Sequence, residues 1–266
     1  MTSAKAAVFL GGGRITSALV AGLRLAGYER EIVVYDRNPE KMRALRREAR
    51  VQTARDLKSA VLRAEMLIVA VRPASVAGIL QEILACGVPA PKLCVSLAAG
   101  VPLRRLRGLL AARWVRAMPS PVCRVGRGLT GLSFERSVTK KERRSAREFF
   151  EHVGTVLEIP ERQFDAFTAV YSSSHGYHAL ATLTRAGERA GLGRATALTA
   201  AAHALSDAIS YWRESGLSLG ELLHEAATPG GIAAATMSAM DEAGYARVVE
   251  DGLRAGIQQA RLNAKR

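Results

Sequence analysis

Three consecutive glycines near the start of the chain are the residues whose type and spacing suggest chemistry most directly. Gly11, Gly12 and Gly13 follow an apolar run and precede residues with helical spacing. A glycine-rich turn between a strand and a helix lets the backbone approach a pyrophosphate, which then lies at the free N–H groups of the helix N-terminus. Gly11 would make the tight turn and Gly13 the close approach, and Arg14 and Ile15 would begin the anion-binding helix. A plain strand-to-helix turn is the alternative, because glycines alone are a weak signal.

The end of the next predicted strand bears on which dinucleotide such a turn would hold. Asp36 lies there, and a carboxylate at this position can bind the ribose 2′-hydroxyl of NAD. Arg37, beside it, could instead meet the 2′-phosphate of NADP. The two residues favour different cofactors, so the sequence predicts NADPH or NADH without deciding between them. Thr16 stands where this turn usually has a third glycine or an alanine, so the packing of helix on strand must accommodate a larger residue.

These residues require a parallel sheet to hold them, and the first part of the chain has the pattern of one. Short β-branched runs alternate with amphipathic stretches, as in successive βαβ units. Asn38-Pro39 predicts one helix start, and the capping box from Thr139 to Glu142 predicts another. The predicted strands are residues 6–10, 31–35, 66–71, 93–97, 114–118 and 155–159, and the predicted helices include 14–26 and a charged helix ending near 152.

The second part of the chain has a different composition and a different periodicity. Strand signals vanish, and residues rich in Ala, Leu and Glu predict helices that are interrupted at 191–194, 215–218 and 228–231. We therefore expect an α/β protein, with an N-terminal Rossmann-type parallel sheet domain followed by an all-α C-terminal domain. The predicted division is 1–160 for the dinucleotide-binding domain and 161–266 for the helical domain. The apolar faces of these helices should pair with a second copy of the chain.

Composition excludes several classes of protein. The chain has 266 residues, of which 48% are hydrophobic and 23% charged, so neither a disordered nor a fibrous protein is expected. The longest apolar run, 66–71, is too short to cross a bilayer, and we expect no membrane association. Cys86, Cys94 and Cys123 are odd in number and form no CxxC pair, which predicts reduced thiols and a cytoplasmic protein.

The charge balance raises the question of a nucleic-acid partner. The net charge is +14 and the sequence pI about 10.4, values that are typical of nucleic-acid-binding proteins. However, the basic residues alternate with Glu and Ala in predicted helices such as 42–50 and 140–147, and aromatic residues make up only 5% of the chain. Stacking platforms for bases are therefore missing, and we expect solvated helix faces and no nucleic-acid partner. A basic surface also suits an enzyme with anionic ligands.

Further segments, taken together with the glycine turn, form a pattern that is typical of one protein family. They are Ala70-Val71-Arg72-Pro73, 96–100, 115–119, 125–131, 165–169 and Thr228-Pro229-Gly230-Gly231. In order and spacing they resemble pyrroline-5-carboxylate reductase, from about Ala6 to Arg261. The resemblance implies a Rossmann domain, a helical domain that interlocks with a second subunit in a homodimer or larger homo-oligomer, and NAD(P)H-dependent reduction of a cyclic imine. The implied reaction converts 1-pyrroline-5-carboxylate to L-proline.

The resemblance also implies which further residues hold the dinucleotide. They lie where later strands of the sheet end, and they are Ala70, Val71, Arg72, Pro73, Ala98, Ala99, Met118 and Ser120. Ser120 replaces the family's Asn and could donate one hydrogen bond to the cofactor or the substrate. Alternatively, it is only a turn residue before Pro121.

The chain departs from the family where the substrate is expected. Arg72-Pro73 replaces K-P, 120–122 replaces N-T-P, 171–177 rewrites S-G-S-G-P-A-Y, and Ile232-Ala233 replaces the final T-T of S-P-G-G-T-T. Ile232 cannot supply the hydroxyl that the family's first threonine carries. Two alternatives therefore stay open: a diverged reductase of another imine or carbonyl acid, and a dinucleotide-binding homologue that has lost catalysis.

Reduction of an imine also requires a proton source and donors for the substrate carboxylate. The turn made by Thr228, Gly230 and Gly231 can supply a hydroxyl and backbone N–H groups, or it is a plain turn between helices. His175 lies within the family's active-site loop and could donate a proton near neutral pH, or it could simply face solvent. His178, three residues on, could form a metal pair with it, but no third ligand is recognisable, so no metal is predicted.

Overall fold

The computed structural model describes residues 5–265 and divides the chain into two compact units. The first unit contains the chain up to Ala169 together with the residues from Gly256 onward, and the second contains Val170–Ala255. The sequence interpretation divided the chain between residues 160 and 161. In the structure, the helix that follows this point, Phe164–Val170, belongs to the first unit up to Ala169, and so does the end of the last helix.

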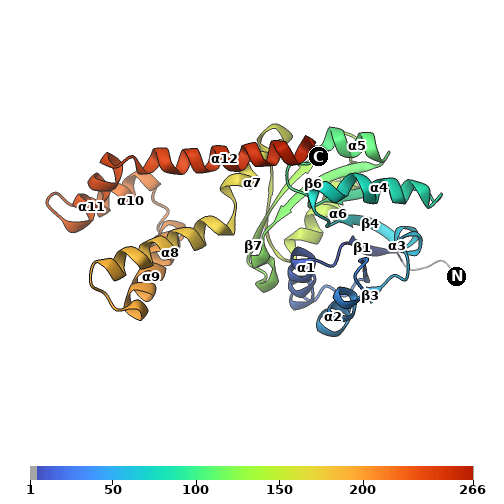
Figure 1. Ribbon diagram of the computed structural model, residues 1–266, viewed down its shortest axis with the longest axis horizontal. Coiled ribbons are helices and arrows are strands. Elements are labelled where there is room, and N and C mark those ends of the chain that lie inside the picture. Colours follow the sequence, from blue (N-terminus) through green and yellow to red (C-terminus); the bar gives the residue numbers. More distant parts are fainter. Residues whose placement is uncertain (1–4, 266) are drawn as a thin grey trace. The chain divides into compact units, whose positions relative to one another are not determined.

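The first unit is built on one sheet of eight strands in the order β3-β2-β1-β4-β5-β6-β7-β8 (Figure 1). Neighbouring strands are parallel except β6 and β7, which are antiparallel. This order reverses direction at β1, as in doubly wound folds, and it confirms the predicted Rossmann-type sheet. The strands are β1 Ala6–Leu10, β2 Ile32–Tyr35, β3 Gln52–Thr53, β4 Ala64–Val69, β5 Leu93–Ser96, β6 Arg113–Pro119, β7 Gly128–Phe134 and β8 Gly154–Glu158.

Strand β7 is missing from the sequence prediction. It contains two glycines, which weaken strand propensity and hide the apolar alternation that identifies a strand. Packing explains one of them: a Cβ at Gly131 would lie 2.3 Å from Cε1 of Phe167, which belongs to the helix Phe164–Val170. The antiparallel step is therefore a feature that short-range pattern does not reveal.

Helices cover both faces of the sheet (Figure 1). Apolar side chains of α1, α2 and α6 pack against one face, and those of α3, α4 and α5 pack against the other. Two helix starts are capped as predicted: Asn38 accepts hydrogen bonds from the N–H groups of Glu40 and Lys41, and Thr139 and Glu142 form a capping box. The helices of this unit are α1 Arg14–Leu25, α2 Pro39–Ala49, α3 Leu57–Arg63, α4 Val76–Ala85, α5 Leu103–Leu109, α6 Lys140–Glu151 and α7 Phe164–Val170.

The second unit is helical, and three of its breaks fall at or next to the predicted ones, whereas the break at 243–244, between α11 and α12, was not predicted. Its helices are α8 Ser173–Arg189, α9 Arg194–Ser215, α10 Leu219–Ala226, α11 Ile232–Glu242 and the first part of α12 Tyr245–Lys265. Within its described residues only the side chains of Ala197 and Ala201 are buried, whereas large apolar side chains such as Tyr211, Trp212 and Val248 are exposed. One copy of the chain therefore leaves this unit without a core of its own.

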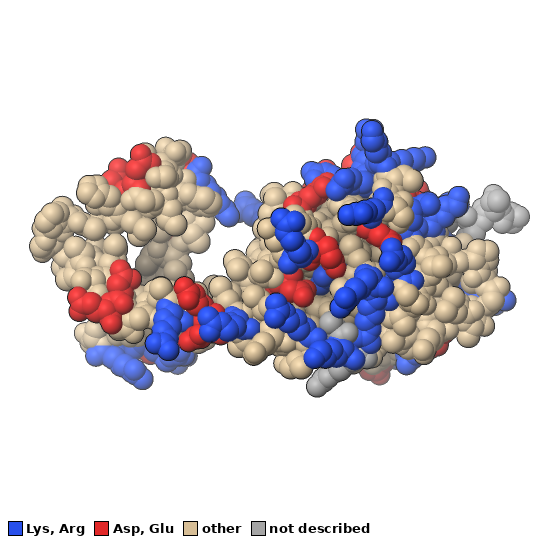
Figure 2. All heavy atoms as spheres, turned by 90° about the horizontal axis from the view of Figure 1, so that it is seen from above, with Lys and Arg blue, Asp and Glu red and all other residues tan. Residues whose placement is uncertain are grey.

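Surface charge and hydropathy add two observations. On the face drawn in Figure 2, Lys and Arg side chains are interspersed with Asp and Glu. Elsewhere in the chain cations are paired as well: Arg143 and Arg147 of α6 form ion pairs with Glu158 of β8. None of the helices in the described part of the chain combines the length and the apolar character that a membrane crossing needs.

Candidate functional site

The glycine turn lies at the carboxyl edge of the sheet, between β2 and β4. The N–H of Gly11 donates to the carbonyl of Tyr35 at 2.8 Å, and the N–H of Ala70 donates to the carbonyl of Leu10 at 2.8 Å. Gly11 has φ +109°, and a Cβ there would lie 2.6 Å from the carbonyl oxygen of Ala70. Only glycine fits this position, so the turn keeps the tight geometry that the sequence predicts.

No steric contact within the protein requires a glycine at position 13. It is the N-cap of α1 in an extended conformation with φ −79°, and a Cβ there would meet nothing within 4 Å. The first turn of α1 contains no acidic residue, and no side chain caps its N–H groups. The helix N-terminus thus faces open space with its partial positive charge unsatisfied, which is the arrangement that binds a pyrophosphate.

Thr16 shows how the turn accommodates a residue larger than glycine. Its side chain is fully buried, and its hydroxyl donates to the carbonyl of Gly11 at 2.6 Å, so the added atoms close the turn. The close helix contact occurs further along α1, where a Cβ at Gly22 would lie 2.0 Å from the carbonyl oxygen of Cys123. Cys123 belongs to the short 3-10 turn η2 (Pro121–Val125).

The Asp36 carboxylate is already engaged by the protein. It accepts the N–H of Gly12 at 2.7 Å and that of Asn38 at 2.8 Å, and the Lys41 ammonium lies 3.7 Å away. Asp36 therefore shapes the glycine turn, in addition to any contact with a ribose. Arg37 is exposed and pairs with Glu82 of α4 on the surface. Lys41 was missed by sequence reasoning, although its place in the first turn of the helix capped by Asn38 is a usable signal.

The other predicted cofactor residues lie along the same edge. Ala70 and Val71 follow β4, Arg72 and Pro73 begin the 3-10 turn η1 (Pro73–Ser75), Ala98 and Ala99 follow β5, and Met118 and Ser120 lie at the end of β6. Because β1, β4, β5 and β6 run parallel, these residues and the glycine turn share one edge. Arg72 is exposed and makes no ion pair with any residue between 5 and 265. Ser120 is buried, and its hydroxyl accepts a hydrogen bond from the N–H of Val122 at 3.3 Å, so its side chain caps the turn that begins at Pro121.

Arg124 is a further cation that sequence reasoning missed. It comes from η2, and its guanidinium donates to the hydroxyl of Ser17 at 2.9 Å, one turn into α1. Arg14 lies exposed in the first turn of the same helix. Two guanidinium groups therefore lie beside the helix end that faces open space. Spacing could not identify Arg124, because it joins α1 only through the packing of η2 on Gly22.

The predicted substrate residues belong to the second unit. The N–H of Gly231 donates to the carbonyl of Thr228 at 2.8 Å, with Pro229 and Gly230 between them and φ +74° at Gly230. Proline followed by a glycine of positive φ is the signature of a type II turn, and Gly231 then caps α11. His175 lies in the first turn of α8, exposed.

One chain does not bring these substrate residues together. In Figure 1 the first turn of α8 and the turn between α10 and α11 lie at opposite ends of the helical unit. His175 and the set formed by Thr228, Gly230 and Gly231 are therefore separate features of a single subunit. Ile232, which follows the turn, exposes 89% of its surface, so the turn is followed by an exposed apolar side chain.

Residues 5–265 contain no group of three or more His, Cys, Asp or Glu side chains placed to hold a metal ion. Fold and site together define a dinucleotide-binding α/β protein with an appended helical unit. Comparison with known proteins agrees. A family model described as NADP oxidoreductase, coenzyme F420-dependent, matches residues 6–100, and one described as pyrroline-5-carboxylate reductase dimerisation matches residues 161–262.

Individual proteins extend this similarity over nearly the whole chain. Pyrroline-5-carboxylate reductase from Corynebacterium melassecola is 31% identical and covers 88% of this chain and 90% of its own length. A solved pyrroline-5-carboxylate reductase from Coxiella burnetii is 26% identical with a TM-score of 0.86, covering 99% of this chain and 100% of its own. Pyrroline carboxylate reductase from Plasmodium falciparum, solved with NADP bound, shares the fold at 19% identity and a TM-score of 0.86, covering 99% of each chain. The chain belongs to the pyrroline-5-carboxylate reductase family, which confirms the resemblance predicted from the sequence.

Proposed function

We propose that this protein reduces 1-pyrroline-5-carboxylate to L-proline with a nicotinamide dinucleotide. The observation that carries the proposal is the open, uncapped N-terminus of α1 behind Gly13, in a chain that belongs to the reductase family along most of its length. A dinucleotide fits this edge because Gly13 leaves room for its phosphates and two guanidinium groups flank them. When bound, the cofactor supplies a hydride to the imine carbon.

The chain's own residues bind and orient the dinucleotide. The N–H groups of the first turn of α1 donate to the pyrophosphate, and Arg14 and Arg124 offset its charge. Ala99 presents a small side chain after β5, where a flat ring can approach the backbone, whereas the Ala98 side chain is buried in the core. Met118 and Ser120 bound the same edge at the end of β6.

Among the two cofactors, we propose NADPH as the better substrate. Both Asp36 oxygens already accept backbone N–H groups, and the Lys41 ammonium lies nearby, so this carboxylate is a weakened partner for a ribose diol. Arg37 is held only by an exposed pair with Glu82, which contributes little and can be exchanged for a 2′-phosphate. These two features support NADPH over NADH.

We also propose that two subunits combine to bind the imino acid. The Thr228 hydroxyl and the N–H of Gly230 would hold its carboxylate, whereas the N–H of Gly231 already donates to the Thr228 carbonyl and only shapes the turn. His175 would donate the proton. Because these groups lie at opposite ends of one helical unit, a second copy of the chain has to supply one of them. The exposed apolar side chains of this unit, and its match to a dimerisation model, support a homodimer or larger assembly. The three free cysteines are compatible with the predicted cytoplasmic location.

The test follows the oxidation of NADPH and NADH at the nicotinamide absorbance, with 1-pyrroline-5-carboxylate as substrate and proline measured as product. Saturable proline formation, with a larger kcat/KM for NADPH, is the expected result. Dinucleotide binding without proline formation would contradict the proposal. It would then favour another imine or carbonyl acid, for which the exposed Ile232 is the motivating feature, or a homologue without catalysis.

A further inference from the structure

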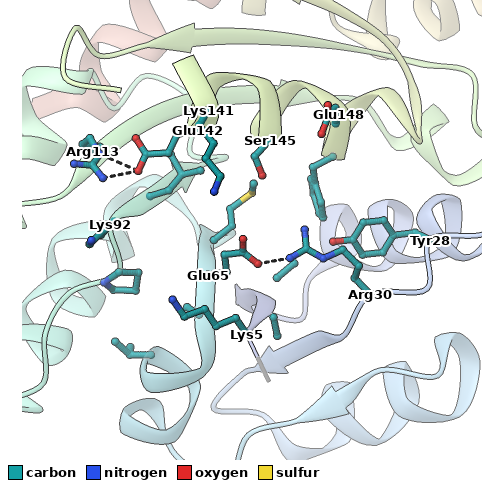
Figure 3. A pocket seen from close by; sticks show the side chains of 18 of the residues that line it. Lys5, Tyr28, Arg30, Glu65, Lys92, Arg113, Lys141, Glu142, Ser145 and Glu148 are labelled. Atoms are coloured by element: carbon teal, nitrogen blue, oxygen red, sulfur yellow. Dashed lines mark hydrogen bonds and ion pairs between the residues drawn. The ribbon is translucent and has the colours of Figure 1, made fainter. Parts of the chain in front are cut away.

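A second cavity lies at the edge of the sheet opposite the glycine turn. Its volume is about 910 Å³, within the range of small-molecule sites. The amino ends of β1, β4, β5 and β6 form its floor, and α6 and the loop from α1 to β2 form its walls (Figure 3). The parallel strands run from this edge to the edge that carries Gly13, so the two sites are separated by the length of the sheet.

Part of the charge around this cavity is neutralised within the protein. Glu142 of α6 accepts hydrogen bonds from the guanidinium of Arg113, with 2.9 Å between Oε1 and Nε. Arg30 pairs with Glu65 across the strand ends. These four residues form two ion pairs within the protein. The charged groups that could bind a ligand are therefore those without such partners.

Three ammonium groups without partners border the same space. Lys5 precedes β1, Lys92 precedes β5 and Lys141 lies in the first turn of α6. None of them makes a hydrogen bond or ion pair with another residue of the described chain, 5–265. Figure 3 shows Lys141 extending from α6 toward the strand ends from which Lys5 and Lys92 come. Three cations that line one cavity from separate elements favour an anionic ligand there.

Tyr28 supplies an independent observation at the other end of the cavity. Only 9% of this residue is exposed, and its ring packs edge-on against Phe149 and His152. Its hydroxyl is directed toward the cavity and has no hydrogen-bond partner in the described part of the chain (Figure 3). Burial raises the pKa of Tyr28, so the hydroxyl stays a neutral donor. Because the ring is fixed by packing and the hydroxyl opens onto the cavity, a ligand there can accept a hydrogen bond from it.

The cavity also has an apolar wall. Met66, Pro91 and Phe149 are among the residues that line it. Two further lining carboxylates, Glu29 and Glu148, are exposed and make no ion pair within residues 5–265. A ligand that fills this space would place its charge at the lysines and an uncharged body with a hydrogen-bond acceptor toward Tyr28.

We propose that this cavity binds a small organic phosphate at a site distinct from the dinucleotide site. Lys5, Lys92 and Lys141 hold the phosphate, the apolar wall covers the organic body, and the Tyr28 hydroxyl donates to it. The dinucleotide and this ligand occupy opposite edges of the sheet, so they bind without competing.

The test is a calorimetric titration of the full chain with phenyl phosphate, an organic phosphate that does not resemble a dinucleotide, and with inorganic phosphate. The titrations are run with and without saturating NADP⁺. We expect phenyl phosphate to bind more tightly than inorganic phosphate, and its Kd to be the same in both conditions. Equal affinity for the two probes, absence of binding, or competition by NADP⁺ overturns the proposal. The titration without NADP⁺ keeps this result independent of the proposed enzyme activity.

Two neighbouring lysines of α6 provide a matched pair of variants. Lys141→Glu should weaken phenyl phosphate binding by about tenfold or more, because it replaces a charge-assisted contact by repulsion. Lys140→Glu makes the same charge change one residue away, outside the cavity lining, and should change Kd by less than about twofold. Tyr28→Phe removes only the hydroxyl and should weaken binding by about threefold to tenfold. Equal Kd values for the Lys140 and Lys141 variants would overturn the site.

Discussion

Substitution of Gly13 by aspartate should separate dinucleotide binding from folding. Gly13 adopts φ −79° and a Cβ there meets nothing, so any side chain can be placed without strain. Aspartate is a preferred N-cap, and its charge is favourable at a helix N-terminus. The folded protein should therefore be as stable as the parent or slightly more stable, with the new carboxylate in the space that the pyrophosphate needs.

The expected loss of affinity follows from Coulomb's law. A carboxylate about 5 Å from a phosphate charge, at an effective dielectric constant of about 20, raises the free energy of the complex by about 3 kcal/mol. This corresponds to a Kd about 200-fold higher for NADPH. Gly13→Asn has nearly the same shape without the charge, so the difference between the two variants measures the electrostatic part.

The assay is a titration of NADPH fluorescence together with thermal unfolding at one protein concentration. Gly11→Ala serves as the contrasting variant, because φ +109° and a contact of 2.6 Å with the Ala70 carbonyl should destabilise the fold by about 1–3 kcal/mol. If Gly13→Asp binds NADPH within about threefold of the parent, the pyrophosphate does not lie at this helix end and the site assignment is wrong.

Three further predictions concern other parts of the chain. Arg116 is 2% exposed and forms ion pairs with the carboxylates of Glu161 and Asp165. Arg116→Met should therefore lower the free energy of unfolding, measured in denaturant titrations, by about 3 kcal/mol. The control Arg107→Met, at an exposed ion pair, should lower it by less than about 1 kcal/mol, and equal losses would contradict the reasoning. Burial raises the pKa of Cys94 to about 12 and also raises that of Cys123, so a thiol reagent at about pH 8 should label the half-buried Cys86 alone in the native protein; rapid labelling of all three would refute it. Arg37→Ala should lower kcat/KM for NADPH by about tenfold and leave that for NADH within about twofold, and equal effects on both would remove Arg37 from cofactor recognition.

Local sequence signals were sufficient for the features that depend on a few neighbouring residues. The caps at Asn38 and Thr139, three helix breaks of the second unit and the tight turn at Gly11 all follow from short-range chemistry. Strand β4 begins two residues before its prediction, at Ala64, because the apolar run alone does not mark where pairing with β1 starts. The antiparallel strand β7 was missed because its two glycines weaken the strand signal, and one of them, Gly131, is required by a packing contact with Phe167.

The candidate site likewise combines features that the sequence predicts with features that depend on tertiary packing. Asp36 could be placed at the end of β2 from sequence, but its engagement by the N–H groups of Gly12 and Asn38 required coordinates. Arg124 reaches α1 through tertiary packing, which no spacing rule contains. The separation of His175 from the Thr228 turn also depends on how helices stack, and a linear motif cannot indicate whether its parts meet within one subunit.

The scarcity of buried side chains in the second unit has a consequence for how the protein is maintained. A helical unit whose only buried side chains are Ala197 and Ala201, within the residues described, gains little from folding as a monomer. If its stability comes from a second copy, the midpoint of thermal unfolding rises with protein concentration by mass action. A cell that makes too little of the chain would then hold mostly incomplete subunits, which are open to proteolysis. Activity would fall more steeply than abundance, so the amount synthesised itself becomes a control on the pathway step.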